Sequence, residues 1–162
     1  MRKPIFNAFK LLSDAGHWRV NVSGISFEQG GEGVVVFASQ LDNGTLHIII
    51  CNHEMSDTNV TVELSGVPIN VTGATVARID DTHANAYTAW QNMGSPAANA
   101  SGQLDPEVIS VLHDAAQLVD KPLSPQDVRM DSNTLCLRLS IPHHGIARVK
   151  LNLPSNLVAN DV

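Results

Sequence analysis

The stretch Leu41-Asp42-Asn43-Gly44 lies between two runs rich in β-branched and apolar residues, Val34–Ser39 and Thr45–Asn52. Asn-Gly in such a place is a strong signal for a β-hairpin, because both central residues of the favoured turn need a positive φ angle. Within the second run two sets of side chains alternate between opposite faces, Leu46, Ile48 and Ile50 against His47, Ile49 and Cys51. The stretch therefore predicts two antiparallel strands joined by a tight turn.

Further runs of strand length follow the same alternation and are separated by turn residues. They are Trp18–Val22, Asn59–Leu64, Thr75–Ile79, Thr134–Ile141 and Ile146–Leu153. Several short strands with turns between them are typical of a two-sheet antiparallel β-sandwich. A length of 162 residues favours a single domain over residues 1–162. The fold class predicted is thus mainly β.

Two helices are expected outside the sandwich. The first covers about residues 4–15, with Pro4 in its first turn and Gly16 in a left-handed position after its end. Its apolar residues share one face, and we expect that face to be buried; they are Ile5, Ala8, Phe9, Leu12 and Ala15.

The second helix covers about residues 105–119, with Asp105 as its N-cap and Pro106 in its first turn. Its expected buried residues are Val108, Val111, Leu112, Ala115 and Leu118, and prolines 122 and 125 are expected to end it. A short helix or turn is also expected at Ala84–Asn92.

Composition excludes some classes of partner. The chain has 10 Lys and Arg against 16 Asp and Glu, a net charge of −6, so it lacks the basic character of a nucleic-acid-binding protein. No run approaches the roughly 20 apolar residues of a membrane-spanning helix. Asn7, Lys10 and Asp14 interrupt any signal-peptide core after the charged start, so the expected location is the cytoplasm of a bacterial-type cell.

No cofactor and no metal ion are expected. Cys51 and His53 share one strand face, but no third ligand stands at zinc spacing. The tandem pair His143-His144 points to opposite faces of an extended chain, which is unfavourable for binding one ion. There is no Gly-rich loop followed by a helix that could hold a phosphate group.

Three stretches carry a resemblance to a known family. Residues 3–13 (KPIFNAFKLLS) look like the segment that closes the catalytic barrel in family 39 glycoside hydrolases, the β-xylosidases and α-L-iduronidases. Residues 78–96 (RIDDTHANAYTAWQNMGSP) are similar to a stretch of their C-terminal β-sandwich, and Leu139–Leu151 fits its final hairpin. Together the three stretches extend the resemblance over nearly the whole chain. The part of the family's enzymes that it concerns is the C-terminal sandwich region alone.

The resemblance implies a β-xylosidase-type hydrolase that releases xylose from β-xylosides or another small glycoside. Family members act through two glutamates on a (β/α)₈ barrel, which would precede Met1 and has no counterpart here. The family's Asn-Glu pair does not occur, and none of the five glutamates stands in a matching context. An enzyme of this kind would need a non-standard site on the sandwich. The alternative is a non-catalytic accessory or scaffold module, with or without sugar binding.

Glycoside hydrolysis requires two groups that flank the scissile bond. The first candidate set is the turn residue Asp42 and the early-strand residue His47, together with His53, Glu54 and Asp57. A turn Asp and an early-strand His can approach at a sheet edge, where Asp would act as base or nucleophile and His as acid. Alternatively, Asp42 is an ordinary turn residue and His47 is a packed or surface residue of the strand.

The second candidate set is Asp80, Asp81 and His83. Neighbouring carboxylates repel, and this can raise one pKa and produce a general acid. Tyr87 and Trp90 could stack on a sugar and, with Glu54, bind substrate. Alternatively, Asp80 or Asp81 caps the following turn, and Trp90 belongs to the core.

Assembly gives one more expectation. The apolar face of the first helix would pack on a barrel in the family's full-length enzymes. Without it, we expect that helix to fold back on the sandwich or to form a two-fold homodimer.

Overall fold

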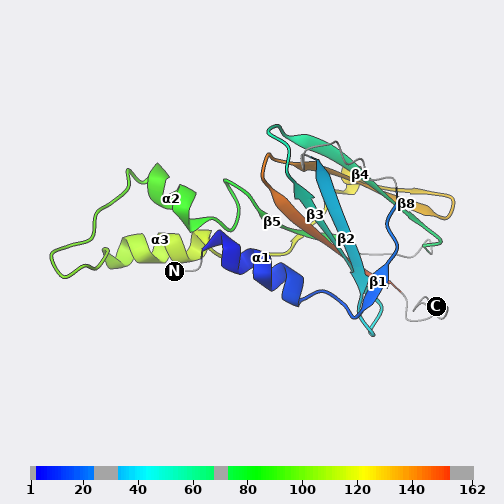
Figure 1. The fold of residues 1–162 in the computed structure, drawn as a ribbon, viewed down its shortest axis with the longest axis horizontal. Helices are drawn as coiled ribbons and strands as arrows, with labels where there is room; N and C mark the ends of the chain where they lie inside the picture. The colour runs from blue at the N-terminus through cyan, green and yellow to red at the C-terminus, as the bar shows by residue number, and fades with distance from the viewer. Residues whose placement is uncertain (1–2, 24–32, 68–72, 154–162) are drawn as a thin grey trace.

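The computed structural model describes residues 3–23, 33–67 and 73–153. Nine strands form two antiparallel sheets in this part of the chain (Figure 1). The larger sheet has the order β1 (Trp18–Val20), β2 (Val34–Gln40), β3 (Thr45–Asn52), β9 (Ile146–Asn152), β5 (Thr75–Ile79), β6 (Lys121–Pro122). The smaller sheet has the order β4 (Thr58–Ser65), β8 (Thr134–Ile141), β7 (Val128–Asp131). The predicted mainly β sandwich is confirmed, and β6 and β7 were not predicted.

The main core lies between the two sheets. Alternation places one face of β3 and β9 against one face of β8, so that Ile50, Val149 and Leu137 are fully buried together. The outer face of β3 is also covered, because Leu11 packs there against Ile49. The larger sheet is therefore buried on both faces at its centre, which explains why three isoleucines, 48 to 50, follow one another in β3.

The predicted hairpin joins β2 to β3, in the register Gln40↔Leu46. Gly44 has a φ angle of 85° and its N–H donates to the Leu41 carbonyl at 2.9 Å. Asn43 has no positive φ, so the expectation of two positive φ angles is wrong. The loop has one residue more than a two-residue turn, and the glycine alone takes the left-handed position.

Helix α1 (Pro4–Ser13) is shorter than predicted and buries a different face. Leu11 and Asn7 are fully buried, whereas Ile5, Phe9 and Leu12 are 60%, 65% and 53% exposed. The Asn7 amide donates to the carbonyls of Ala84 and Ala116 at 3.1 and 2.9 Å. The helix thus folds back on the sandwich as expected. Its buried face is set by the hydrogen bonds of Asn7, which the periodicity of apolar residues cannot detect.

Gly16 has a role other than the predicted left-handed cap. Its φ is not positive, and a Cβ atom here would lie 2.1 Å from the Gln40 carbonyl oxygen. Its N–H donates to the Ser39 hydroxyl at 3.0 Å. The glycine is needed because the chain leaving α1 passes directly against the end of β2.

Helices α2 (Ala86–Asn92) and α3 (Pro106–Ala115) pack on each other through Ala86, Leu112 and Ala116, and they extend from one end of the sandwich (Figure 1). There are thus three α-helices in the described part of the chain: the two expected, and α2, which falls where a short helix or turn was expected at Ala84–Asn92. None of the described helices is long and apolar enough to cross a membrane.

Several details of these helices differ from the prediction. Asp105 caps α3, as predicted, but α3 ends at Ala115 and the prolines at 122 and 125 play no part in stopping it. Asn85, not Asp80 or Asp81, caps α2. Val111 is 49% exposed, because α3 stands at the margin of the molecule and buries one narrow stripe around Leu112.

Candidate functional site

The predicted pair Asp42 and His47 does not meet. The Asp42 carboxylate accepts a hydrogen bond from the Trp18 indole N–H at 2.9 Å, at the exposed β2–β3 turn. His47 is 3% exposed on β3, a central strand that pairs with β2 and β9, and its Nδ1 atom has no hydrogen-bond partner in the described part of the chain. The expectation of a contact at a sheet edge is therefore wrong, because β3 lies inside the sheet.

His47 belongs to a charged cluster under the C-terminal end of α1. On β9, Arg148 donates to Asp14 at 2.8 Å and to both oxygens of Asp120 at 2.9 and 3.0 Å, and Lys150 donates to Asp120 at 2.9 Å. Burial, and then the nearby positive charges of Arg148 and Lys150, lower the pKa of His47. A buried neutral histidine here packs beside the cluster and cannot reach a substrate from the surface.

The second predicted set is a turn. The Asp80 side chain, 3% exposed, accepts hydrogen bonds from the Thr82 N–H at 2.8 Å and the His83 N–H at 2.9 Å, and its carboxylate lies 2.9 Å from the His83 ring. Burial acts to raise the pKa of Asp80, but these hydrogen bonds outweigh it and hold the pKa below its usual value. The raised pKa expected for a general acid is therefore not found at Asp80.

Of the predicted sugar-binding residues, Tyr87 and Trp90 lie together on α2, whereas Glu54 lies on a different loop. The Tyr87 and Trp90 ring centroids are 5.8 Å apart on α2, with Tyr87 exposed. Trp90 is half-buried, and its indole N–H donates to the Pro96 carbonyl at 3.1 Å, which fixes the loop after α2. Glu54 lies on the β3–β4 loop and its backbone N–H donates to the Asn52 side chain at 2.9 Å.

A different set of side chains is brought together where five strands end. The C-terminal ends of β3, β5 and β8 and the N-terminal ends of β4 and β9 share one end of the sandwich, as the registers Cys51↔Ile146, Ile79↔Ile146 and Thr58↔Ile141 show. Loops from distant parts of the chain therefore meet at this end.

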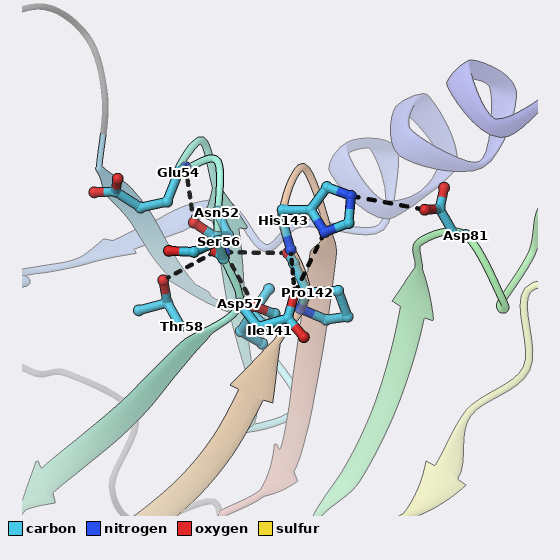
Figure 2. Close-up of polar contacts among 9 residues, drawn as sticks. All are labelled: Asn52, Glu54, Ser56, Asp57, Thr58, Asp81, Ile141, Pro142 and His143. Carbon is cyan, nitrogen blue, oxygen red and sulfur yellow. Dashed lines mark hydrogen bonds and ion pairs between the residues drawn. The ribbon is translucent and has the colours of Figure 1, made fainter.

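Asn52 holds two of these loops together (Figure 2). Its buried amide donates to the carbonyls of Ser56, Ile141 and Pro142 at 2.9, 3.0 and 3.1 Å. These contacts connect the β3–β4 loop to the tight β8–β9 turn. In that turn the Gly145 N–H donates to the Pro142 carbonyl at 2.9 Å.

The loops place His143 between two carboxylates (Figure 2). Asp57 accepts a hydrogen bond from the His143 backbone N–H at 3.0 Å and lies 3.3 Å from ring atom Nδ1. The other ring nitrogen, Nε2, lies 3.8 Å from the Asp81 carboxylate. The side chains of Asp57, Asp81 and His143 are 66%, 74% and 48% exposed, so this group is open to solvent.

This arrangement has the groups that acid–base chemistry uses. The hydrogen bonds from the His143 backbone and ring lower the pKa of Asp57 and keep it a carboxylate. No group of three or more metal-binding side chains was found among residues 3–23, 33–67 and 73–153.

Sequence reasoning missed this grouping, although each member was noticed separately. Asp57 was placed with Asp42, Asp81 with Asp80, and His143 with its neighbour His144. The available signal was topological: in an antiparallel sandwich, the turn before Ile146 must lie beside the ends of the strands that pair with β9. The Arg148 cluster gave no sequence signal, because its two carboxylates, Asp14 and Asp120, are 134 and 28 residues away from Arg148.

No family model matches the chain. In sequence it is similar to a β-xylosidase of Caldicellulosiruptor saccharolyticus, with 30% identity over 154 residues, 92% of this chain. The chain spans 29% of that protein's length. The similarity thus covers nearly all of this chain and less than a third of the relative.

Solved structures agree on the fold. A GH39 enzyme from Xanthomonas axonopodis pv. citri matches with a TM-score of 0.70 and 14% identity, over 94% of this chain and 31% of that one. A β-xylosidase from Caulobacter crescentus, described as monomeric, matches with a TM-score of 0.68 and 18% identity over the same shares. These comparisons confirm that the chain resembles the C-terminal region alone of family 39 glycoside hydrolases.

Proposed function

We propose that this protein is a β-xylosidase-type glycoside hydrolase that releases xylose from small β-xylosides. The observation that carries the proposal is the 30% identity to a β-xylosidase over 92% of the chain. The proposed site is the strand-end group Asp57, His143 and Asp81, since it combines two carboxylates and an imidazole within reach of a solvent-borne substrate.

In this proposal Asp57 orients the His143 ring through its contact with Nδ1. The Nε2–H of His143 donates its proton to the glycosidic oxygen as the bond to the anomeric carbon breaks. A water molecule forms the new bond to that carbon, and its proton passes to the solvent. Asp81 lies 3.8 Å from Nε2, too close to act as a base on the opposite face of the sugar, and its role in the proposal is to hold the Nε2–H in position.

The test is hydrolysis of an aryl β-xyloside by highly purified protein. We expect His143→Gln and Asp81→Asn to lower kcat by roughly 10²–10⁴-fold, while His53→Gln, an exposed histidine of the neighbouring loop, leaves it unchanged. Parallel Asp42→Asn and His47→Gln variants test the pair expected from the sequence. A loss confined to those two variants would move the site to the β2–β3 end, and turnover that no variant alters would indicate a contaminating enzyme.

A second function has its own supporting observation, the exposed apolar face of α1. Ile5, Phe9 and Leu12 are each more than half exposed on one helix, and the chain spans under a third of its relatives. Both observations favour an accessory module that packs this face against a barrel domain.

The accessory role makes a different prediction. The chain would lack turnover by itself and would bind a separately produced barrel portion of the Caldicellulosiruptor β-xylosidase. Phe9→Ser should weaken that binding, whereas Lys10→Gln, at a charged position about 100° further round the helix, should not. Turnover by the chain alone, lost in His143→Gln, would decide for the enzyme.

The homodimer through α1 stays a prediction. The exposed face of α1 is compatible with it, but the Caulobacter enzyme, described as monomeric, does not support it. The expected cytoplasmic location is likewise a proposal.

A further inference from the structure

A cleft of about 730 Å³ opens between the β5–β6 edge of the larger sheet and strands β4 and β8 of the smaller sheet. Arg78 on β5, Lys121 on β6 and Arg138 on β8 line it, together with one carboxylate, Asp127. The cleft therefore carries more positive than negative charge, in a protein whose net charge is −6. Such a local reversal of sign attracts anionic ligands.

These three cations form no ion pair among the described residues. By contrast, Arg129, Arg148 and Lys150 all have carboxylate partners in the same part of the chain. Arg78 donates to the Ser140 carbonyl at 2.6 Å, which positions its guanidinium on the cleft wall and leaves further N–H donors for a ligand. A bound carboxylate would accept hydrogen bonds from these three cations, which come from three different strands, and would neutralise part of their charge.

The remaining lining favours a sugar over a small inorganic anion. Val76, Pro122 and Leu123 supply apolar surface, and Asn59 and Ser124 supply hydrogen-bonding groups. The volume lies within the roughly 300–1,000 Å³ typical of sites for organic ligands. A hollow of about 240 Å³ shares Arg78 and Lys121 with the cleft, and another of about 310 Å³ shares Arg138.

We propose that this groove binds a saccharide bearing a carboxylate, with Arg78, Lys121 and Arg138 pairing with the carboxylate. The site is separate from the strand-end group Asp57, His143 and Asp81 and does not depend on the hydrolase activity. It is an anion-selective sugar site built across the two sheets.

The test is calorimetric titration of the full chain with glucuronic acid, with glucose as the neutral probe and inorganic phosphate as the anion without a sugar. We expect saturable glucuronate binding that weakens with added salt. The exposed-residue variants Lys121→Gln and Arg138→Gln should each weaken it by about tenfold. The matched control is Arg19→Gln, on β1 at the opposite edge of the larger sheet, and it should not change the binding. Arg19 is exposed and forms no ion pair with the described residues.

Each outcome decides the proposal. Glucuronate binding that is lost in the two cleft variants and kept in Arg19→Gln supports it. Equal binding of glucose would overturn the role of the cations. Phosphate that binds as tightly as glucuronate and competes with it would show a general anion site and overturn the sugar specificity. An absence of saturable glucuronate binding would refute the proposal outright. Turnover of a xyloside plays no part in this readout, so the two proposals fail independently.

Discussion

The guanidinium of Arg148 donates a hydrogen bond to the Asp14 carboxylate at 2.8 Å, although 134 residues separate them along the chain. The Arg148 side chain is 3% exposed, and its second amino group binds Asp120. One arginine on β9 thus fixes both the end of α1 and the segment that follows α3. A buried charge with two carboxylate partners makes the attachment of both segments sensitive to any change in the cluster.

Asp120→Asn removes the charge that Arg148 and Lys150 share. We expect a loss of about 2 kcal/mol in the free energy of unfolding, less than for a fully buried pair because Arg148 keeps Asp14. Asp131→Asn is the control, since Asp131 pairs with Arg129 in solvent and its loss should cost less than about 0.5 kcal/mol. Urea denaturation measures both, and equal effects would show that the cluster adds no stability.

Asn7→Ala removes both hydrogen bonds by which α1 holds Ala84 and Ala116. We expect a loss of about 2–3 kcal/mol, because two carbonyls are left without their donor in a buried place. Asn7→Asp should cost more, since a carboxylate would face those carbonyl oxygens. Ser13→Ala, at the exposed end of the same helix, should change stability by less than about 0.5 kcal/mol. Thermal or urea unfolding measures these changes. An equal loss of stability in Asn7→Ala and Ser13→Ala would contradict the anchoring role of Asn7.

Gly16→Ala tests the close approach of the chain to β2. A Cβ atom would lie 2.1 Å from the Gln40 carbonyl oxygen, so the backbone must shift, at a cost of about 3 kcal/mol or more. The control Gly102→Ala has a positive φ but open space around it, and should cost about 1 kcal/mol. The difference in urea midpoint between the two variants isolates the clash, and similar midpoints would mean that β2 and the loop separate readily.

His47 should make stability depend on pH near neutrality. Its pKa is lowered in the folded protein from 6.5, so the unfolded chain binds more protons as the pH falls below that value. The contribution of His47 to the free energy of unfolding is therefore fully present above about pH 6.5, and it declines on acidification toward pH 5.

Urea unfolding at pH 7.5 and pH 5 measures this dependence in a window above the titration of ordinary carboxylates. We expect a smaller difference between the two pH values in His47→Gln than in the unsubstituted protein, and an unchanged difference in the exposed-loop control His53→Gln. An unchanged difference in His47→Gln would assign the pH dependence to other groups.

Much of the sandwich could be predicted from local chemistry. The alternation in Thr45–Asn52, the glycine of the hairpin and the cap at Asp105 all rest on interactions between residues close in sequence. Strand β6 could not be predicted, because it has two residues and exists through its pairing with β5. The buried face of α1 was predicted wrongly, because Asn7 is polar and its partners are 77 and 109 residues away.

The candidate site was less accessible to sequence reasoning than the fold. Asp80 and His83 do lie together, since a turn of four residues brings them into contact. Asp42 and His47 are only slightly further apart in sequence, but they lie on a turn and in a central strand, so their side chains have different environments. The geometry around His143 needed the register of β3, β5 and β9, which no spacing encodes.

The sequence by itself determined the sandwich class, the main hairpin, seven of the strands and the resemblance to family 39, because periodicity and turn chemistry act over a few residues. Tertiary structure alone decided which carboxylates meet His143, which cations share the cleft and which face of α1 is buried. These outcomes depend on contacts between residues far apart in the chain. Such contacts form when strands pair and loops are fastened by groups such as Asn52 and Arg148.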